Sequence, residues 1–475
     1  MSIPEFDDHF QENNSENMED KLRHYRRMIR KSDHSEMPSP EILETLVNYC
    51  MEKDKYEEAY DFCKYWADVA PYSADVWHKY GFILINLNRH HEALLALDKA
   101  LGLNPVDIDA MVHKSVAYGQ ADDNDNALAY IDKALSLDPS NEEALFHKGF
   151  ILESIRHYEK ALEIFNYLEQ SHQFRKEALQ ETAYCLHLMK NYETAIEKYN
   201  EAIEEDPYDI SLWHNLGIIY HQMHRYAKAI DCFEMAIAID DEFFLAWHNK
   251  GNSFASMGRL HESIESFREA NRLNPEDLDT LHNLASVEGD AGLYTEALEK
   301  FDKVLENRPD HYQSYFGRGV CYDSLENFTQ ALEDYNNSLN IFDHNAEVWY
   351  AKADLLYNMG DPVAAIKAYN RVIELEPDNY DCHYDIALTK IEVGEAEPAV
   401  EHLKEALKFK PKWANAYYQL AKAEAMMGSI DSALNNLRIG IYIDPELAEK
   451  FDIDFCSILS KKDFKSFHEE ISKIS

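Results

Sequence analysis

The sequence is poor in positive charge and has no paired cysteines and no long apolar run. Its 475 residues carry 46 Lys and Arg against 88 Asp and Glu, a formal net charge of −42. Nucleic acids and anionic membranes are bound through basic patches, so this balance argues against both as partners. No apolar stretch is long enough for a membrane span. The seven Cys lack any CxxC spacing and are typical of reduced thiols, so we expect a cytoplasmic protein.

Proline recurs at a fixed interval. Nine of the 14 prolines, from Pro71 to Pro445, stand 34 or 68 residues apart, and Gln173, Asp241 and Asp343 occupy the skipped positions. A small residue follows ten residues after each of these positions, and another small residue follows twelve residues later. Because closely crossing helices exclude large side chains, such columns predict repeated helix–helix contacts.

Between these columns the apolar residues follow a helical period. Leu212, Leu216 and Tyr220 recur every three or four residues, and a second such stripe follows. A column of glycines separates the two stripes in several periods, as expected where a left-handed residue ends a helix. The prolines follow the second stripe, where they stop helix propagation. Each period of 34 residues is therefore predicted to be a helix–turn–helix unit.

One period shows the pattern W-x2-L-G-x2-Y followed by A-x3-F. The matching residues are Trp213, Leu216, Gly217, Tyr220, Ala229 and Phe233. The chain therefore resembles the tetratricopeptide repeat family, over twelve unbroken repeats at residues 40–447. The resemblance implies an all-α fold, a right-handed superhelical solenoid whose first helices line a concave groove. Pentatricopeptide arrays have a different period and a basic surface, and armadillo and HEAT repeats are longer.

The two ends differ from the repeats. Residues 1–39 are expected to form an acidic, disordered tail over 1–20, followed by a short basic helix. Residues 448–475 are expected to form a degenerate helical cap, because a solenoid exposes an apolar face at each end. The basic segment 21–31 has two interpretations. It either merely touches the first repeat, or docks on an acidic surface of its own chain or of a second copy, so self-association stays open.

Catalysis and metal binding are not expected. No nucleotide-binding, hydrolase or zinc-protease motif stands in the strand or loop context that it needs, so we expect no enzyme and no cofactor. His214, His248 and His282 share a repeat column. Stacked helices lie about 8–10 Å apart, whereas zinc ligands lie about 2 Å from the ion. We therefore expect no metal site.

Function is expected on the concave wall that the resemblance implies. Its positions 2, 5, 6, 9, 12 and 13 in twelve first helices hold 17 acids but only two Lys. Asn side chains can bind a peptide backbone, and aromatic rings beside Asp suit Lys or Arg. The alternatives are ordinary polar lining and rings that pack between helices. The predicted peptide-binding residues are His214, Asn215, His248, Asn249, Asn252, His282, Asn283, Phe316, Tyr350, Asp354, Tyr384, Asp385 and Tyr418.

The sequence thus predicts a non-enzymatic scaffold or adaptor that binds basic or extended protein segments. A regulatory or chaperone-like subunit that holds an enzyme or an unfolded client is the alternative, and the sequence does not separate the two. A clamp for a C-terminal carboxylate is not expected. Gln313 and Gly317 stand where the clamp of this family needs basic residues.

Overall fold

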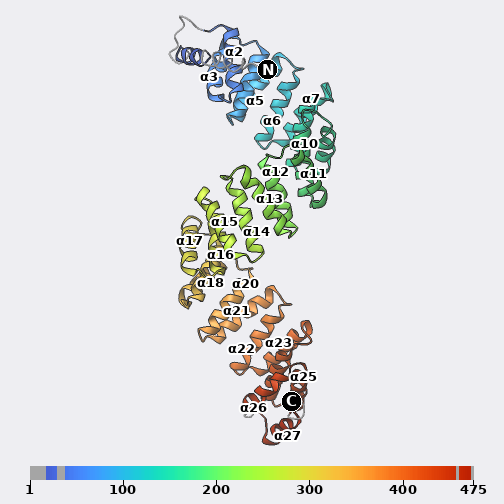
Figure 1. The fold of residues 1–475 in the computed structure, drawn as a ribbon, viewed down its shortest axis with the longest axis vertical. Helices are drawn as coiled ribbons and strands as arrows, with labels where there is room; N and C mark the ends of the chain where they lie inside the picture. The colour runs from blue at the N-terminus through green and yellow to red at the C-terminus, as the bar shows by residue number, and fades with distance from the viewer. Residues whose placement is uncertain (1–17, 29–37, 456–458, 472–475) are drawn as a thin grey trace, which may run out of the picture. The chain divides into compact units, whose positions relative to one another are not determined.

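The computed structural model describes residues 18–28, 38–455 and 459–471. Within these ranges the chain folds into helices joined by short turns and has no strand (Figure 1). None of these helices is long and apolar enough to traverse a bilayer. The expected disordered tail lies outside the described residues up to residue 17, whereas residues 18–20 already belong to a helix.

The helices follow one another in pairs. First helices begin at a nearly constant spacing of 34 residues, for example at Ala74, Ile108 and Glu142. The helices are α2 (Pro40–Glu52), α3 (Tyr56–Val69), α4 (Ala74–Asn86), α5 (His90–Leu103), α6 (Ile108–Gln120), α7 (Asn124–Leu137), α8 (Glu142–Ser154), α9 (Tyr158–Leu168), α10 (Arg175–Leu188), α11 (Tyr192–Glu205), α12 (Ile210–Gln222), α13 (Tyr226–Ile239), α14 (Phe244–Ser256), α15 (Leu260–Leu273), α16 (Leu278–Asp290), α17 (Tyr294–Asn307), α18 (Tyr312–Ser324), α19 (Phe328–Ile341), α20 (Ala346–Asn358), α21 (Pro362–Leu375), α22 (Tyr380–Glu392), α23 (Ala396–Phe409), α24 (Ala414–Met426), α25 (Ile430–Ile443), α26 (Ala448–Phe455) and α27 (Lys461–Ile471).

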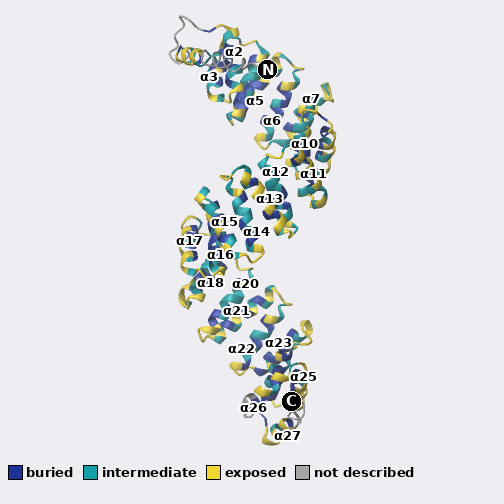
Figure 2. Ribbon diagram, in the orientation of Figure 1, coloured by how far each residue is buried: buried dark blue, intermediate teal, exposed yellow. Residues whose placement is uncertain are grey.

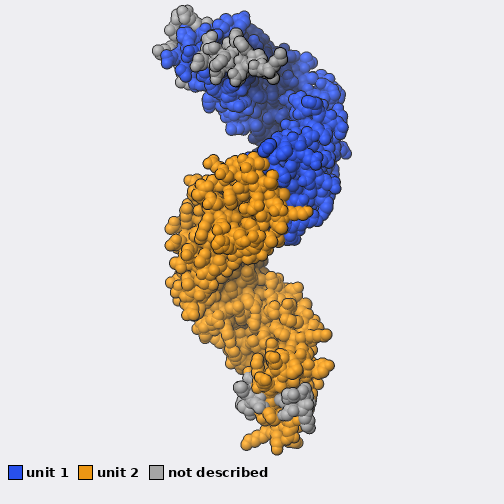
Figure 3. Space-filling view, in the orientation of Figure 1, with its two compact units in different colours: residues 1–225 blue, residues 226–475 orange. Residues whose placement is uncertain are grey.

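The chain divides into two compact units, residues 1–225 and 226–475 (Figure 3). Unit 1 contains α2–α12, and unit 2 contains α13–α27. The division lies between the two helices of one predicted repeat. In each unit the buried residues lie where neighbouring helices face each other (Figure 2).

The first column of small residues lies where the two helices of a pair cross. A Cβ atom added at Gly149 would lie 2.5 Å from the Phe165 ring, and one added at Gly251 would lie 2.9 Å from the Phe267 ring. Atoms at such distances overlap, so the helices could not keep this separation. The close crossing inferred from the sequence is therefore confirmed at these positions.

Replacing Gly149 with alanine is expected to lower the free energy of unfolding by about 1–3 kcal/mol, as overpacking in a core usually does. Gly102 on α5 is a matched control, since an added Cβ there meets nothing within 4 Å. Gly102→Ala should be neutral or slightly stabilising because alanine is the better helix former. Urea unfolding followed by circular dichroism measures both effects. Equal stability of the two variants would contradict the close-crossing explanation.

The tryptophan column ties each first helix to the turn before it. The indole Nε1 of Trp213 donates to the Pro207 carbonyl at 2.9 Å, and that of Trp349 donates to the Asp343 carbonyl at 2.8 Å. Trp77 and Trp247 make the same bond, with the carbonyl six residues earlier. These indoles therefore hold the end of one repeat against the start of the next.

The turns between paired helices contain a left-handed residue at every repeat. The predicted glycines have positive φ, from 70° at Gly258 to 86° at Gly394. The same position also has positive φ where the residue is not glycine: Asp54, Asn88, Asp122, Arg156, Lys190, His224 and Glu326. Because a left-handed backbone disfavours residues with a Cβ, the helix-pair geometry must impose this conformation.

A helix over residues 18–28 packs against α2 and α3 in unit 1. Leu22 is buried there and joins the apolar cluster that contains Leu43 and Phe62. The Arg26 Nη1 atom lies 2.7 Å from Glu58 Oε1, and Lys55 pairs with Glu19. The described part of the predicted basic segment thus contacts an acidic patch of its own chain. Arg30 and Lys31 lie outside the described residues.

Aromatic side chains fill the other end of unit 2. Phe451, Phe455 and Phe467 are buried on α26 and α27. The Phe451 ring centroid lies 5.4 Å from that of Phe455 and 5.0 Å from that of Phe464. This cluster covers the apolar face of α24 and α25, which includes Tyr418 and Leu437.

Candidate peptide-binding groove

The predicted peptide-binding residues lie on first helices of both units. His214 and Asn215 are on α12 in unit 1. The other eleven are on five first helices of unit 2, from α14 to α24. The two groups belong to different units and are therefore treated separately.

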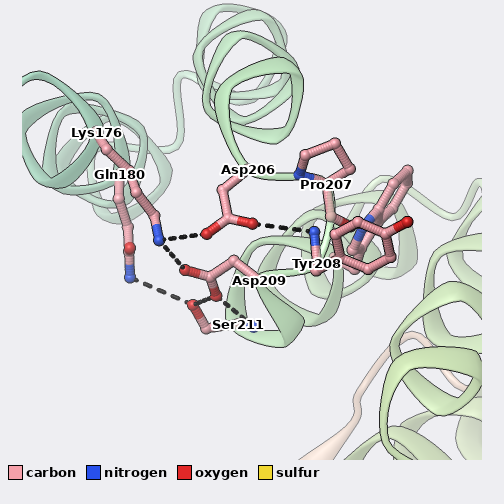
Figure 4. A network of polar contacts seen from close by, with 8 residues as sticks. Lys176, Gln180, Asp206, Pro207, Tyr208, Asp209 and Ser211 are labelled. Atoms are coloured by element: carbon pink, nitrogen blue, oxygen red, sulfur yellow. Dashed lines mark hydrogen bonds and ion pairs between the residues drawn. The ribbon is translucent and has the colours of Figure 1, made fainter. Parts of the chain in front are cut away.

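A polar network holds the start of α12 against α10 (Figure 4). The Lys176 Nζ atom lies 2.7 Å from Asp206 Oδ2 and 3.2 Å from Asp209 Oδ2. Asp209 caps α12 by accepting from the Ser211 amide at 3.0 Å. The hydrogen bond from Lys176 lowers the pKa of Asp206, and Asp206 in turn raises the pKa of Lys176. This lysine is thus neutralised by its own chain, and the network fixes the helix that carries His214 and Asn215.

The two predicted histidines of unit 2 bind the next first helix. His248 Nδ1 lies 2.7 Å from Thr280 Oγ1, and His282 Nδ1 lies 2.9 Å from Ser314 Oγ. The Thr280 hydroxyl also donates to Asp277, so His248 Nδ1 carries the proton. Burial lowers the pKa of His282 to about 4. Both imidazoles therefore act as neutral links between repeats in this structure.

The predicted asparagines are not all brought together. Asn283 Nδ2 donates to Asn252 Oδ1 at 3.2 Å, a contact between residues 31 apart. The column at 34-residue spacing contains Asn249 and Asn283, while Asn215 lies in the other unit. The contact that the structure shows is therefore diagonal to the predicted column.

The aromatic column is only partly accessible. Tyr418 has 2% of its surface exposed and packs against Phe455, at 5.5 Å between ring centroids. Its assignment as a peptide contact is therefore corrected, because the C-terminal helices cover it. Phe316, Tyr350 and Tyr384 are half-buried. Each also packs against a second-helix residue or the turn after it, as for Tyr350 and Tyr369 with centroids 5.7 Å apart.

Three adjoining hollows follow the first helices α16 to α22 of unit 2, and we call them the α16–α22 groove. Their volumes are 470, 410 and 290 Å³. Phe316 and Glu347 line both the first and the second hollow, and Asp354 lines both the second and the third. Five predicted residues line this groove: His282, Phe316, Tyr350, Asp354 and Asp385.

A row of three aspartates crosses the first helices of this region. Asp323, Asp354 and Asp385 lie on α18, α20 and α22 with a spacing of 31 residues. Each carboxylate accepts a hydrogen bond from one tyrosine: Tyr335 for Asp323, Tyr369 for Asp354, and Tyr350 for Asp385. Asp323 was not among the predicted site residues. The same 31-residue diagonal that joins Asn252 to Asn283 identifies it.

The three aspartates lack a basic partner. Within the described residues, no Lys or Arg forms an ion pair with any of them, and burial raises the pKa of each. Asp323 raises the pKa of Asp354 further, and Asp354 does the same to Asp385. Arg318, by contrast, is occupied by Asp302 and Asp334. The carboxylates of this row are therefore under-compensated, and a cation that reached them would be stabilised.

Family profiles match the chain over several stretches. The tetratricopeptide repeat profiles cover residues 74–107, 186–224, 210–243, 245–277, 276–344 and 346–379. One stretch, residues 124–155, matches the protein prenyltransferase alpha subunit repeat. No curated protein matches the chain significantly.

Solved structures of helical-repeat proteins are also similar. The crystal structure of MamA protein is 21% identical, with a TM-score of 0.34, over 37% of this chain and 96% of that one. YrrB, described as a TPR protein with an unusual peptide-binding site, is 18% identical over 39% and 95%, with a TM-score of 0.34. The APC/C hetero-tetramer Cut9-Hcn1 is 12% identical over 92% and 96%, with a TM-score of 0.42.

The helix pairs, the small-residue crossings and the family profiles agree. The fold is an all-α solenoid of helix–turn–helix repeats. The chain belongs to the tetratricopeptide repeat family and is a protein-interaction scaffold.

Proposed function

We propose that the chain is a non-enzymatic scaffold that binds an extended, basic protein segment in the α16–α22 groove. The aspartate row carries this proposal. Its three carboxylates lie on successive first helices and have no basic partner among the described residues. A Lys or Arg side chain of a bound segment would supply the missing charge, with arginine favoured for its paired donors.

The groove also offers contacts that do not depend on charge. Phe316 and Tyr350 present half-buried rings between the first two hollows, where a methylene stem or a guanidinium plane can pack. The regular spacing of the aspartates suits a ligand that passes from one repeat to the next. A folded, convex partner would reach fewer of these hollows than an extended segment.

The proposal is tested by mapping where a basic probe binds. An octa-arginine peptide with a central photoreactive benzoylphenylalanine is cross-linked to the full chain, and the adducts are located by mass spectrometry. Adducts concentrated on α16, α18, α20 and α22 are expected. The same peptide with citrulline in place of arginine is isosteric and neutral, and it should give few adducts.

Two charge-matched triple variants control for the overall acidity. Asp323→Asn, Asp354→Asn and Asp385→Asn together remove the row. Glu299→Gln, Glu333→Gln and Glu397→Gln together remove three exposed acids from second helices. Only the first triple variant should lose the adducts. Equal loss in both, or adducts spread over second helices, would refute the proposed groove.

A further inference from the structure

Two carboxyl groups share a proton on the first helices of unit 1. Glu153 on α8 and Glu181 on α10 are hydrogen bonded to each other, so one of them must be protonated. Burial and the neighbouring Glu153 raise the pKa of Glu181 to about 8. Two carboxylates in a partly buried site cannot both ionise without a compensating charge.

The groups around the pair are acids. The Cys185 thiol donates to Glu153 Oε2 at 3.6 Å, and burial followed by Glu153 raises the pKa of this thiol. The titratable groups that face the pair from the packed helices α8, α9, α10 and α11 are Glu153, Tyr158, Tyr184, Cys185 and Tyr199. Within the described residues, none of the groups acting on the pair is a Lys, Arg or His.

A buried hydroxyl beside the pair is left without a partner. Tyr199 on α11 has 0% of its surface exposed, and its hydroxyl forms no hydrogen bond. Burial and then the charge of Glu181 raise its pKa, while the nearby Asn215 amide acts in the opposite direction. Of the charged groups, Glu181 acts most strongly on this hydroxyl, which places the unsatisfied group on the side of the pair. A buried polar group without a partner is costly and suits a site that is completed by a ligand.

An apolar hollow adjoins the pair along α8. It has a volume of 260 Å³, and Val116, Phe150 and Ile151 line it together with His147 and Ser154. Phe150 is exposed, and Ser154 is the immediate neighbour of Glu153. A ligand that reaches the carboxyl pair can therefore place an apolar group in this hollow.

We propose that Glu153 and Glu181 form a binding site for one cationic side chain, ammonium or guanidinium, of a peptide that seats an apolar neighbour against Phe150. The cation replaces the proton that the two carboxyls now share. On binding, the carboxylic O–H bond breaks, its electron pair stays on the carboxylate, and the proton leaves to the buffer. The site keeps the same net charge, because one positive charge enters as one leaves. This site lies in unit 1 and is independent of the α16–α22 groove.

Proton release on binding is the distinguishing measurement. A tri-arginine amide peptide with one N-terminal phenylalanine is titrated into the full chain at pH 7 by calorimetry, in buffers of different ionisation enthalpy. Because Glu181 is mostly protonated at that pH, about one proton should be released per chain from this site. The citrulline analogue should release none. Spermidine should bind more weakly, because it has no group for the hollow.

Two variants test whether the proton comes from this pair. Glu181→Gln keeps a hydrogen-bond donor to Glu153 but has no proton to lose, and Glu153→Gln is its mirror change. Each should remove about one proton from the count, whereas Glu177→Gln, at an exposed site on the same helix, should not. The Asp323, Asp354 and Asp385 triple variant should keep this released proton, so a failure in one unit is told apart from a failure in the other.

Two results would overturn the inference. One is a proton count that is the same for the wild type and both glutamine variants, with circular dichroism showing all three folded. The other is spermidine binding as tightly as the peptide with equal proton release, which would assign the site to a free amine.

Discussion

Asp354→Asn is expected to weaken binding of an arginine-rich segment by roughly 10- to 100-fold. Removing one charged partner from a hydrogen-bonded ion pair costs about 1.5–3 kcal/mol, and each 1.4 kcal/mol is a factor of ten in affinity. Asp354 lies at the junction of two hollows of the groove, so its loss affects both. Fluorescence anisotropy with a labelled octa-arginine peptide, at a fixed physiological salt concentration, measures the change.

The same variant should not be less stable. Burial raises the pKa of Asp354, which means that the fold disfavours its charged form. The folded chain therefore binds a proton more readily than the unfolded chain, so ionisation costs stability as the pH rises through this range. Neutral asparagine avoids that cost. Glu333→Gln on α19 is the exposed control and should change neither affinity nor stability. A large loss of stability in Asp354→Asn would show a structural role instead.

Phe451→Ala is expected to cost about 3–5 kcal/mol of stability at the C-terminal end of unit 2, as large aromatic truncations in cores do. The ring is fully buried and lies 5.0–5.4 Å, between centroids, from Phe455, Phe464 and Phe467. Without it, the apolar face of α24 and α25 would be exposed to water. Native-state hydrogen exchange should show faster exchange in α24–α27 than in α14–α16.

The matched control is Phe409→Ala at the end of α23. This ring is 51% exposed, so its removal should cost well under the core value. If the two phenylalanine variants lost the same amount, the C-terminal cluster would not be the cover of the last repeats.

The repeat itself could be predicted because its cause is local. Small residues such as Gly149 and Gly251 mark the helix crossings, and a fixed spacing between them needs no knowledge of the tertiary structure. The left-handed turn was visible only where glycine occupies it. Arg156 and Lys190 adopt the same conformation, and nothing in their chemistry announces it.

The groove was predicted less well, because contacts between neighbouring first helices do not follow sequence columns. The hydrogen bond from Tyr350 to Asp385 spans 35 residues, and that from Asn283 to Asn252 spans 31. Each packed helix is rotated and shifted relative to the previous one, so residues at equal repeat positions are not partners. A search along these diagonals would have found Asp323.

The remaining errors come from burial. Tyr418 occupies the same repeat column as Tyr350, but residues beyond the last repeat cover it. The histidines at 248 and 282 bind the next first helix and are neutral. Periodicity gives a position on a helix, whereas exposure depends on what the rest of the chain places above it.

The tryptophan bonds bear on how the chain can be dissected. Each joins the carbonyl that ends one sequence repeat to the helix that begins the next, as for Trp349 and Asp343. A fragment cut at the border of the sequence repeat would sever that bond, whereas a fragment that begins with a second helix would keep it. The unit of cooperative folding is therefore out of phase with the unit of sequence duplication, and excised fragments should start at residues such as Phe328 or Pro362 rather than at Ala346.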